Sequence, residues 1–155
     1  MDIGDLLSAE AIVLRGGASS KRQALHIVAG VAAEALKIDE ARVMDALLER
    51  EALGSTGLGS GVAVPHARIE GMSRVCAVFV RLDAPVAWGA MDDRPVDLLF
   101  GLFAPPSDGA EHLRALAAVS RAMRSPELRE QLRQARTVDA VRALFVQEKT
   151  PATAA

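Results

Sequence analysis

The pattern of hydrophobic and polar positions along the chain has two periods, one typical of strands and one typical of helices. Residues 11–16 and 74–82 are mostly apolar and rich in β-branched side chains, which favours buried strands. A further strand is expected from Val96 to Phe103. Residues 19–36 and 40–51 instead place their apolar side chains at helical spacing. Strands and helices therefore alternate in one chain, but only loosely.

Polar residues mark where several helices begin. Ser20 and Gln23 have the spacing of a capping box, and Asp108 with Glu111 repeats that spacing ahead of a helix over 110–123. Ser125–Pro126 and Thr137 open two more short helices near the end of the chain. The apolar face of the helix over 110–123 is predicted to contain Leu113, Leu116, Ala117 and Val119 or Ser120.

These elements predict an α/β (α+β) domain in which a mixed β-sheet carries helices on both faces. Helices cluster at the end of the chain, which favours a mixed sheet over a strictly parallel doubly wound one. Residues 1–148 are expected to form a single domain, because no linker or internal repeat divides them. Residues 149–155 are expected to be a flexible tail.

Composition narrows the functional class. Half of the residues are hydrophobic, a quarter are charged and the formal net charge is −2, so no basic surface is available to hold a nucleic acid backbone. Apolar runs are too short to insert into a membrane, and the acidic N-terminus does not resemble a secretory signal. A single cysteine, Cys76, excludes an internal disulfide. We therefore expect a soluble cytoplasmic protein.

A glycine-rich segment, GSTGLGSGVAVPHARIEG over residues 54–71, is the most unusual stretch of the chain. Gly54 and Gly59 have P-loop spacing, but Ser60 stands where that motif needs lysine. The dinucleotide fingerprint also fails, since Val62 occupies its third glycine position. Both motifs open a helix, whereas the valines and proline that follow here favour a strand. Nucleotide binding is therefore poorly supported.

The histidine at the end of this segment is the strongest candidate for chemistry. His66 follows Pro65 at the expected end of a short strand, beside turn amides that can bind an anion. A neutral imidazole can attack phosphorus through one nitrogen while the other holds its proton against an acceptor. On residue type alone a structural histidine is more common; the glycine-rich approach makes the two interpretations about even, and composition and spacing do not decide between them.

The remaining reactive residues favour structural interpretations. His26 lies within the first long helix as a surface or packing residue, and Cys76 within an apolar strand as a small buried hydrophobe. The three histidines lack metal-ligand spacing, so no metal site is expected.

Three segments resemble a known family: residues 50–71, PVDLLFGLFAP over 95–105 and EHLRALAAVSRAM over 111–123. They resemble, in this order, the IIA domains of the bacterial phosphoenolpyruvate-dependent phosphotransferase system, fructose–mannitol class. Within that class the chain is most similar to the stand-alone nitrogen-regulatory IIA proteins. The resemblance extends from about Ile3 to Phe145, with one minor departure, since Ala67 stands where many relatives have glycine.

The resemblance implies a phosphoryl-transfer protein without cofactor or metal. It implies that His66 accepts a phosphoryl group at Nε2 from the phosphohistidine of a small HPr-like phosphocarrier or its nitrogen-branch relative. It further implies that Arg50 and His112 match the family's other site residues and hold the phosphoryl oxygens. Without the resemblance, Arg50 would be interpreted as a solvated arginine favoured by a helix C-terminus.

Carrier docking requires a flat, accessible surface around the glycine segment. Gly57, Gly59 and Gly61 would allow close approach, and Leu58, Val62 and Met72 are the candidate apolar contacts.

Three functions remain open at this point. The first is a regulator whose phosphorylation state is sensed by target proteins. The second is a sugar-specific IIA component that passes phosphate to a IIB domain of a permease. The third is a binding regulator whose His66 is never modified.

Overall fold

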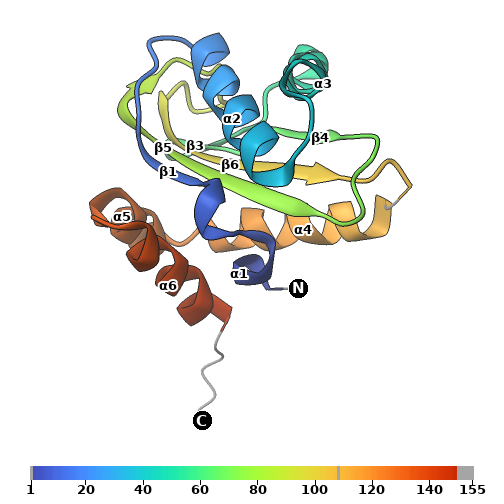
Figure 1. The fold of residues 1–155 in the computed structure, drawn as a ribbon. Coiled ribbons are helices and arrows are strands. Elements are labelled where there is room, and N and C mark those ends of the chain that lie inside the picture. The colour runs from blue at the N-terminus through green and yellow to red at the C-terminus, as the bar shows by residue number, and fades with distance from the viewer. Residues whose placement is uncertain (1, 108, 150–155) are drawn as a thin grey trace.

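The described residues form one six-stranded mixed sheet with helices packed around it, shown in Figure 1 by a computed structural model. The structure describes residues 2–107 and 109–149. The strands are β1 (Ile12–Gly16), β2 (Gly57–Gly59), β3 (Val62–Ala63), β4 (His66–Arg68), β5 (Cys76–Val86) and β6 (Val96–Ala104). The helices are α1 (Ile3–Leu6), α2 (Lys21–Leu36), α3 (Glu40–Leu53), α4 (Gly109–Ala122), α5 (Pro126–Gln134) and α6 (Val138–Lys149), with a 3-10 turn η1 (Ala9–Ala11).

The long strands β5 and β6 pair antiparallel at the centre of the sheet. β1 pairs parallel with β5, and β3 and β4 both pair parallel with β6. β2 pairs antiparallel with β3 at the edge. The mixed sheet expected from the sequence is confirmed.

β3 and β4 are two parts of one extended segment. Val62 lies opposite Leu98 and His66 opposite Leu102, so the register along β6 does not shift between them. Pro65 interrupts the ladder because it has no N–H, although its carbonyl still accepts the Leu102 N–H at 3.0 Å. The sequence analysis expected His66 at the end of a short strand. The structure instead places it within a longer extended segment.

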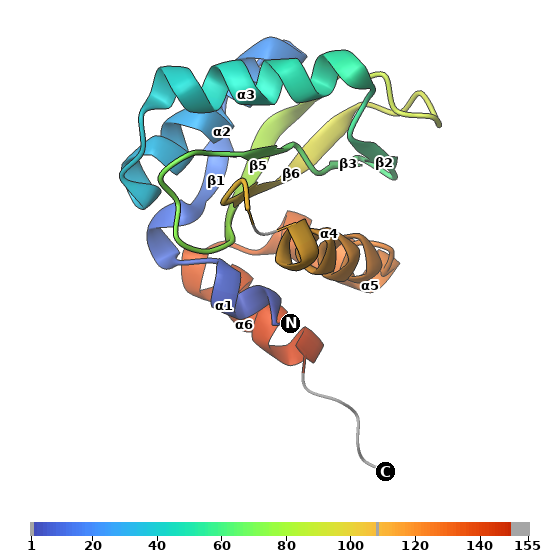
Figure 2. The ribbon, with the colours of Figure 1, turned by 90° about the vertical axis from the view of Figure 1, so that its right-hand side faces the viewer.

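Helices cover both faces of the sheet, as expected. α2 packs against β5 and beside α3 on one face, and α4 packs against β6 on the other (Figure 2). α6 lies on the same side as α4 and contacts β1, α5 and α1. Because both faces are covered, β5 and β6 are buried along most of their length, which explains their nearly continuous apolar sequence.

Most helix starts follow the polar residues that predicted them. The side chains of Ser20, Asp39, Ser125 and Thr137 accept backbone N–H groups of the first helical turn at 3.0 to 3.1 Å. Asp108, the remaining predicted cap, lies outside the described residues. α6 continues to Lys149, one residue into the predicted tail, and the rest of that tail also lies outside the described residues.

The predicted apolar face of α4 is only partly correct, since Val119 is buried and Leu116 packs partly buried against the core, but its other residues differ. Leu113 is 67% exposed and Ala117 is exposed, whereas the buried residues are His112, Ala115, Ala118, Val119 and Ala122. The small alanine side chains let this helix lie close to β6, so the stripe of alanines faces the sheet. The prediction placed Leu113 on the buried face, whereas the helix turns this side chain outward.

The glycine segment forms a β-hairpin that the sequence did not predict. β2 and β3 are joined by Ser60 and Gly61, whose φ angles are 57° and 82°. Two consecutive residues with positive φ are typical of the tightest hairpin turns, and glycine adopts this conformation without strain. The segment is therefore a strand-forming unit and not an open loop.

Candidate functional site

An open cleft of about 680 Å³ lies where the last turn of α3, the strand β4 and the first turn of α4 meet. Arg50, His66 and His112, which are far apart in the sequence, all line it. Each comes from a different element: Arg50 from α3, His66 from β4 and His112 from α4. The structure thus brings the three candidate residues together.

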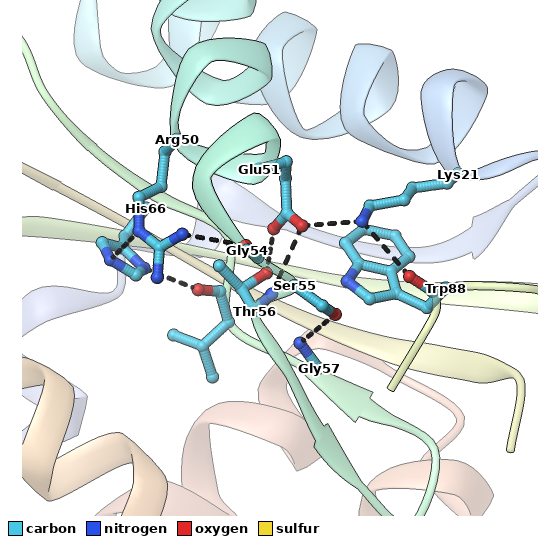
Figure 3. A network of polar contacts seen from close by, with 10 residues as sticks. Lys21, Arg50, Glu51, Gly54, Ser55, Thr56, Gly57, His66 and Trp88 are labelled. Carbon is cyan, nitrogen blue, oxygen red and sulfur yellow. Dashed lines mark hydrogen bonds and ion pairs between the residues drawn. The ribbon is translucent and has the colours of Figure 1, made fainter. Parts of the chain in front are cut away.

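The ring of His66 is held by one hydrogen bond at each nitrogen (Figure 3). Nδ1 lies 2.8 Å from the Val64 carbonyl oxygen, which can only accept, so Nδ1 carries the proton. Arg50 Nε lies 3.2 Å from Nε2 and donates to its lone pair. Arg50 Nη1 in turn donates to the Gly54 carbonyl at 2.9 Å. The half-buried imidazole therefore directs an unprotonated Nε2 toward the Arg50 guanidinium.

His112 meets His66 edge to face, with ring centroids 5.4 Å apart and an interplanar angle of 78°. It is only 5% exposed, and its Nε2 has no hydrogen-bond partner among the described residues. A buried ring nitrogen without a partner is costly unless a ligand or water satisfies it. This nitrogen is thus available to a group bound next to His66.

Burial favours the neutral form of both histidines. It lowers the pKa of His66 below its ordinary value of 6.5; the Val64 hydrogen bond and the nearby Glu51 charge oppose this effect, and the Arg50 charge adds to it. Burial also lowers the pKa of His112, and the repulsion from His66 when it is protonated and from the Arg68 charge lowers that pKa further. A neutral His66 has the free lone pair that a nucleophile requires.

The lowered pKa values predict a dependence of stability on pH. Between 6.5 and the lower folded-state values, the unfolded chain binds more protons than the folded protein, so the free energy of unfolding should fall as pH decreases below 6.5. Urea unfolding at pH 7.5, 6.5 and 5.5 measures this slope. His112→Gln should flatten it, whereas His26→Gln, at a side chain 60% exposed, should not. Equal slopes in these two variants would contradict the assignment to His112.

Arg68 also lines the cleft, and the sequence analysis did not identify it. It is exposed, and a side chain at Gly109, the first residue of α4, would lie 3.6 Å from its Nη2. Its charge therefore reaches the start of α4 as well as His112. The two-residue period of a strand could have revealed it, since His66 and Arg68 point to the same side of β4.

None of the residues predicted to form the docking surface lines the cleft. These are Gly57, Leu58, Gly59, Gly61, Val62 and Met72. Val62 is 1% exposed, so it offers no surface to a partner, which corrects that expectation. A side chain at Gly57 would lie 2.8 Å from Ala90 Cβ. One at Gly59 would lie 3.2 Å from Asp92 Oδ2. These glycines therefore permit close packing within the protein.

Gly61 offers a test of that packing role. Its φ is 82°, and an added Cβ would overlap Arg133 Nη2, which the Asp97 carboxylate and the Ser60 carbonyl hold at 2.9 and 2.8 Å. We expect Gly61→Ala to lower the free energy of unfolding by roughly 2–3 kcal/mol, from backbone strain plus displacement of Arg133. The measurement is urea unfolding.

Gly71→Ala is the matched control, because Gly71 has a similar φ of 95° but open space around its Cβ position. It should lose only about 1 kcal/mol, the cost of backbone strain alone. Equal losses at the two positions would mean that Arg133 yields without cost.

The other titratable candidates lie where the sequence placed them. The His26 side chain is exposed at the surface, with its Nε2 3.6 Å from Glu40 Oε2. Cys76 is buried in β5, and burial raises the pKa of its thiol. In residues 2–107 and 109–149 we find no three His, Cys, Asp or Glu side chains that could hold a metal ion. No helix in this part of the chain is long and apolar enough to cross a membrane.

Comparison with known proteins identifies the family of the chain. The family model described as "Phosphoenolpyruvate-dependent sugar phosphotransferase system, EIIA 2" matches residues 5–148. The nitrogen regulatory protein of Bradyrhizobium diazoefficiens is 41% identical over 155 residues, the full length of both chains. The fructose-specific EIIA component of Haloferax volcanii is 33% identical over 147 residues, covering 94% of this chain and 96% of its own.

A solved structure supports the same assignment. The crystal structure of the nitrogen regulatory protein IIA-Ntr from Neisseria meningitidis superimposes with a TM-score of 0.87 and 34% identity, covering 92% of this chain and 98% of that one. From the family model, the full-length relative and this structure, the chain belongs to the EIIA type 2 family of the phosphoenolpyruvate-dependent phosphotransferase system.

Proposed function

We propose that this protein accepts a phosphoryl group on Nε2 of His66 from the phosphohistidine of an HPr-like phosphocarrier. One observation carries the proposal. The Nδ1 proton of His66 is held by the Val64 carbonyl, which leaves the Nε2 lone pair beside the Arg50 guanidinium in an open cleft. This tautomer is the one that nucleophilic attack through Nε2 requires.

The transfer balances without a metal or an external base. The P–N bond to the carrier histidine breaks as a bond forms between phosphorus and His66 Nε2. The carrier ring begins as a phosphoimidazolium and leaves as neutral imidazole, and His66 gains the positive charge. Its Nδ1 keeps its proton throughout, and the bond to Val64 becomes a stronger, charge-assisted one.

Cationic and hydrogen-bonding groups around His66 are suited to hold the transferring group. The phosphoryl charge spreads over three equatorial oxygens in such a reaction. Arg50 can turn its donors from Nε2 to these oxygens, and His112 Nε2 has no competing partner among the described residues. Arg68 adds a positive charge at the same cleft. The start of α4 further favours an anion, because its first N–H groups have no helical acceptor.

Two exposed leucines make an apolar rim for the carrier. Leu53 is 83% exposed at the end of α3 and Leu113 is 67% exposed on α4, and both line the cleft. Large exposed apolar side chains beside a reactive group are typical of protein docking surfaces. In this proposal they take the part that the sequence analysis assigned to Leu58, Val62 and Met72.

We assign the protein a regulatory role in which its phosphorylation state is sensed by other proteins. The support is the full-length relative named a nitrogen regulatory protein and the similar fold of IIA-Ntr. The second candidate is a sugar-specific IIA component that passes phosphate to a IIB domain. The fructose-specific EIIA relative, which is similar over nearly its whole length, keeps this candidate open.

The test is to mix the protein with HPr-type carrier that has been phosphorylated with a radioactive label. We expect label on this chain that is labile to acid and stable to base, as for a phosphohistidine. No label from any phosphorylated HPr-type carrier would overturn the proposal and favour a binding protein that is never modified. Onward transfer to a purified IIB domain would favour the sugar-specific role.

A further inference from the structure

A buried carboxylate lies next to the cleft and takes no part in the transfer described above. Glu51 is adjacent to Arg50 on α3, and its side chain is only 6% exposed. Lys21, at the start of α2, pairs with Glu51 Oε2 at 2.7 Å. Lys21 Nζ also donates to the Trp88 carbonyl at 3.2 Å and lies 4.9 Å from the centroid of the Trp88 ring (Figure 3). A charge this well buried must be matched by several partners.

The second partner of Glu51 is Thr56, in the connection between α3 and β2. The Thr56 backbone N–H donates to Glu51 Oε2 at 3.3 Å, and its hydroxyl donates to Oε1. Thr56 is itself 6% exposed, so water competes little for these bonds. Glu51 therefore holds both the backbone and the side chain of Thr56.

Thr56 connects this anchor to the histidine. Its carbonyl accepts the Val64 N–H at 3.0 Å, and the Val64 carbonyl accepts the His66 Nδ1 proton at 2.8 Å. The Val64 carbonyl favours a proton on Nδ1, and the Arg50 Nε donor at Nε2 favours the same tautomer. An unbroken series of hydrogen bonds and backbone thus runs from Glu51 to the ring.

We propose that Glu51 is a positioning residue for His66: with Lys21 as its counter-ion it holds Thr56, and Thr56 holds Val64 so that its carbonyl binds Nδ1–H and leaves Nε2 unprotonated. The effect on transfer rate rests on the proposed function of His66. The effect on the tautomer does not, and it can be measured without a carrier.

The expected gain extends to the phosphorylated state. When Nε2 bears phosphate, the ring is positive and its Nδ1–H bond to Val64 is charge-assisted. A Val64 carbonyl that is already held in place accepts this bond without further loss of conformational entropy, whereas a loosely held carbonyl must first be ordered. The Glu51 charge also favours a positive His66 ring, since it opposes the lowering of the His66 pKa.

The experiment measures the ring tautomer by ¹⁵N chemical shifts and long-range ¹H–¹⁵N couplings at pH 7.5. Wild-type His66 should show a protonated Nδ1 and an unprotonated Nε2. In Glu51→Gln and in Thr56→Val, which replaces the hydroxyl with a methyl group, both nitrogens should move toward averaged shifts. Thr56→Ser, which keeps the hydroxyl, should restore the wild-type pattern. Glu34→Gln, which removes an exposed carboxylate from α2, should leave the spectrum unchanged.

Labelling from phosphorylated carrier is measured on the same proteins. We expect Glu51→Gln and Thr56→Val to slow the rate roughly tenfold, equivalent to about 1.4 kcal/mol, with little change in the carrier concentration for half-maximal rate. A wild-type tautomer in both folded variants would overturn the positioning role, even where wild-type His66 is labelled normally. If the tautomer shifts in the variants but neither the wild type nor any variant is labelled, the positioning role stands and the proposed function is rejected. If Glu51→Gln does not fold, the comparison of Thr56→Val with Thr56→Ser decides.

Discussion

We expect His66→Ala to abolish labelling from phosphorylated carrier altogether. The variant removes the ring whose Nδ1 binds the Val64 carbonyl and whose Nε2 lone pair faces the cleft. His112 does not replace it in this prediction, because its ring is 5% exposed. The measurement is the end-point of acid-labile, base-stable label after prolonged incubation with excess carrier.

His26→Ala is the matched control, because it removes an exposed histidine on α2 and should be labelled as the wild type is. Labelling of His66→Ala at the wild-type rate would contradict the assignment of His66 as the acceptor. Label that instead disappears in His112→Ala and persists in His66→Ala would move the acceptor to His112.

The second large effect is expected at the two residues beside the acceptor. Arg50→Ala removes a donor 3.2 Å from Nε2, and His112→Ala removes a ring 5.4 Å from that of His66. Each variant keeps the nucleophile, so each should reach the full end-point of labelling. Loss of one positioned donor typically slows a reaction by roughly 10²-fold or more, about 3 kcal/mol. The slowing should apply to transfer in both directions.

The measurement is the initial rate of labelling and of back-transfer to unlabelled carrier. Arg50→Lys keeps the charge but not the planar fork, so it should fall between Arg50→Ala and the wild type. His112→Gln retains size and a donor, which separates loss of the ring from a packing defect. A variant that transfers at the wild-type rate would remove that residue from the site.

Secondary structure followed closely from local patterns. Helices α2, α5 and α6 begin at the polar residues that predicted them, because a cap needs only a side-chain oxygen two or three residues ahead of free N–H groups. β5 followed from its apolar, β-branched composition, and β6 from its apolar run. These features depend on neighbours in the chain, so one sequence contains the information.

The face of α4 did not follow from its sequence. Leu113 and Ala115 belong to two different apolar stripes of the helix, and hydrophobicity favours burial of the stripe that contains the larger residue. The close approach of α4 to β6 instead selects the alanines, and it carries His112 into the interior and Leu113 to the rim of the cleft. That choice depends on a distance between two elements, which no local pattern contains.

The glycines were also interpreted from local properties alone. Close approach was expected at Gly57, Gly59 and Gly61. The groups that these three glycines approach could not be known, because Ala90, Asp92 and Arg133 come from distant parts of the chain. The sequence therefore indicated close approach, whereas the tertiary structure decided that this approach is internal.

The same division holds at the cleft. The sequence by itself determined the reactive residue types and, through the resemblance of residues 50–71, their family. Only the tertiary structure decided four features: the acceptor of the His66 Nδ1 proton, the lack of a partner for His112 Nε2 among the described residues, the position of the Arg68 charge near His112 and the burial of Glu51. The physical reason is that hydrogen bonding and desolvation act over a few ångströms between groups that the fold brings together, whether they are close in the chain, as Val64 and His66 are, or far apart, as Lys21 and Glu51 are. A helix cap or a strand can be recognised from adjacent residues, but the pKa and tautomer of a histidine depend on everything packed around it.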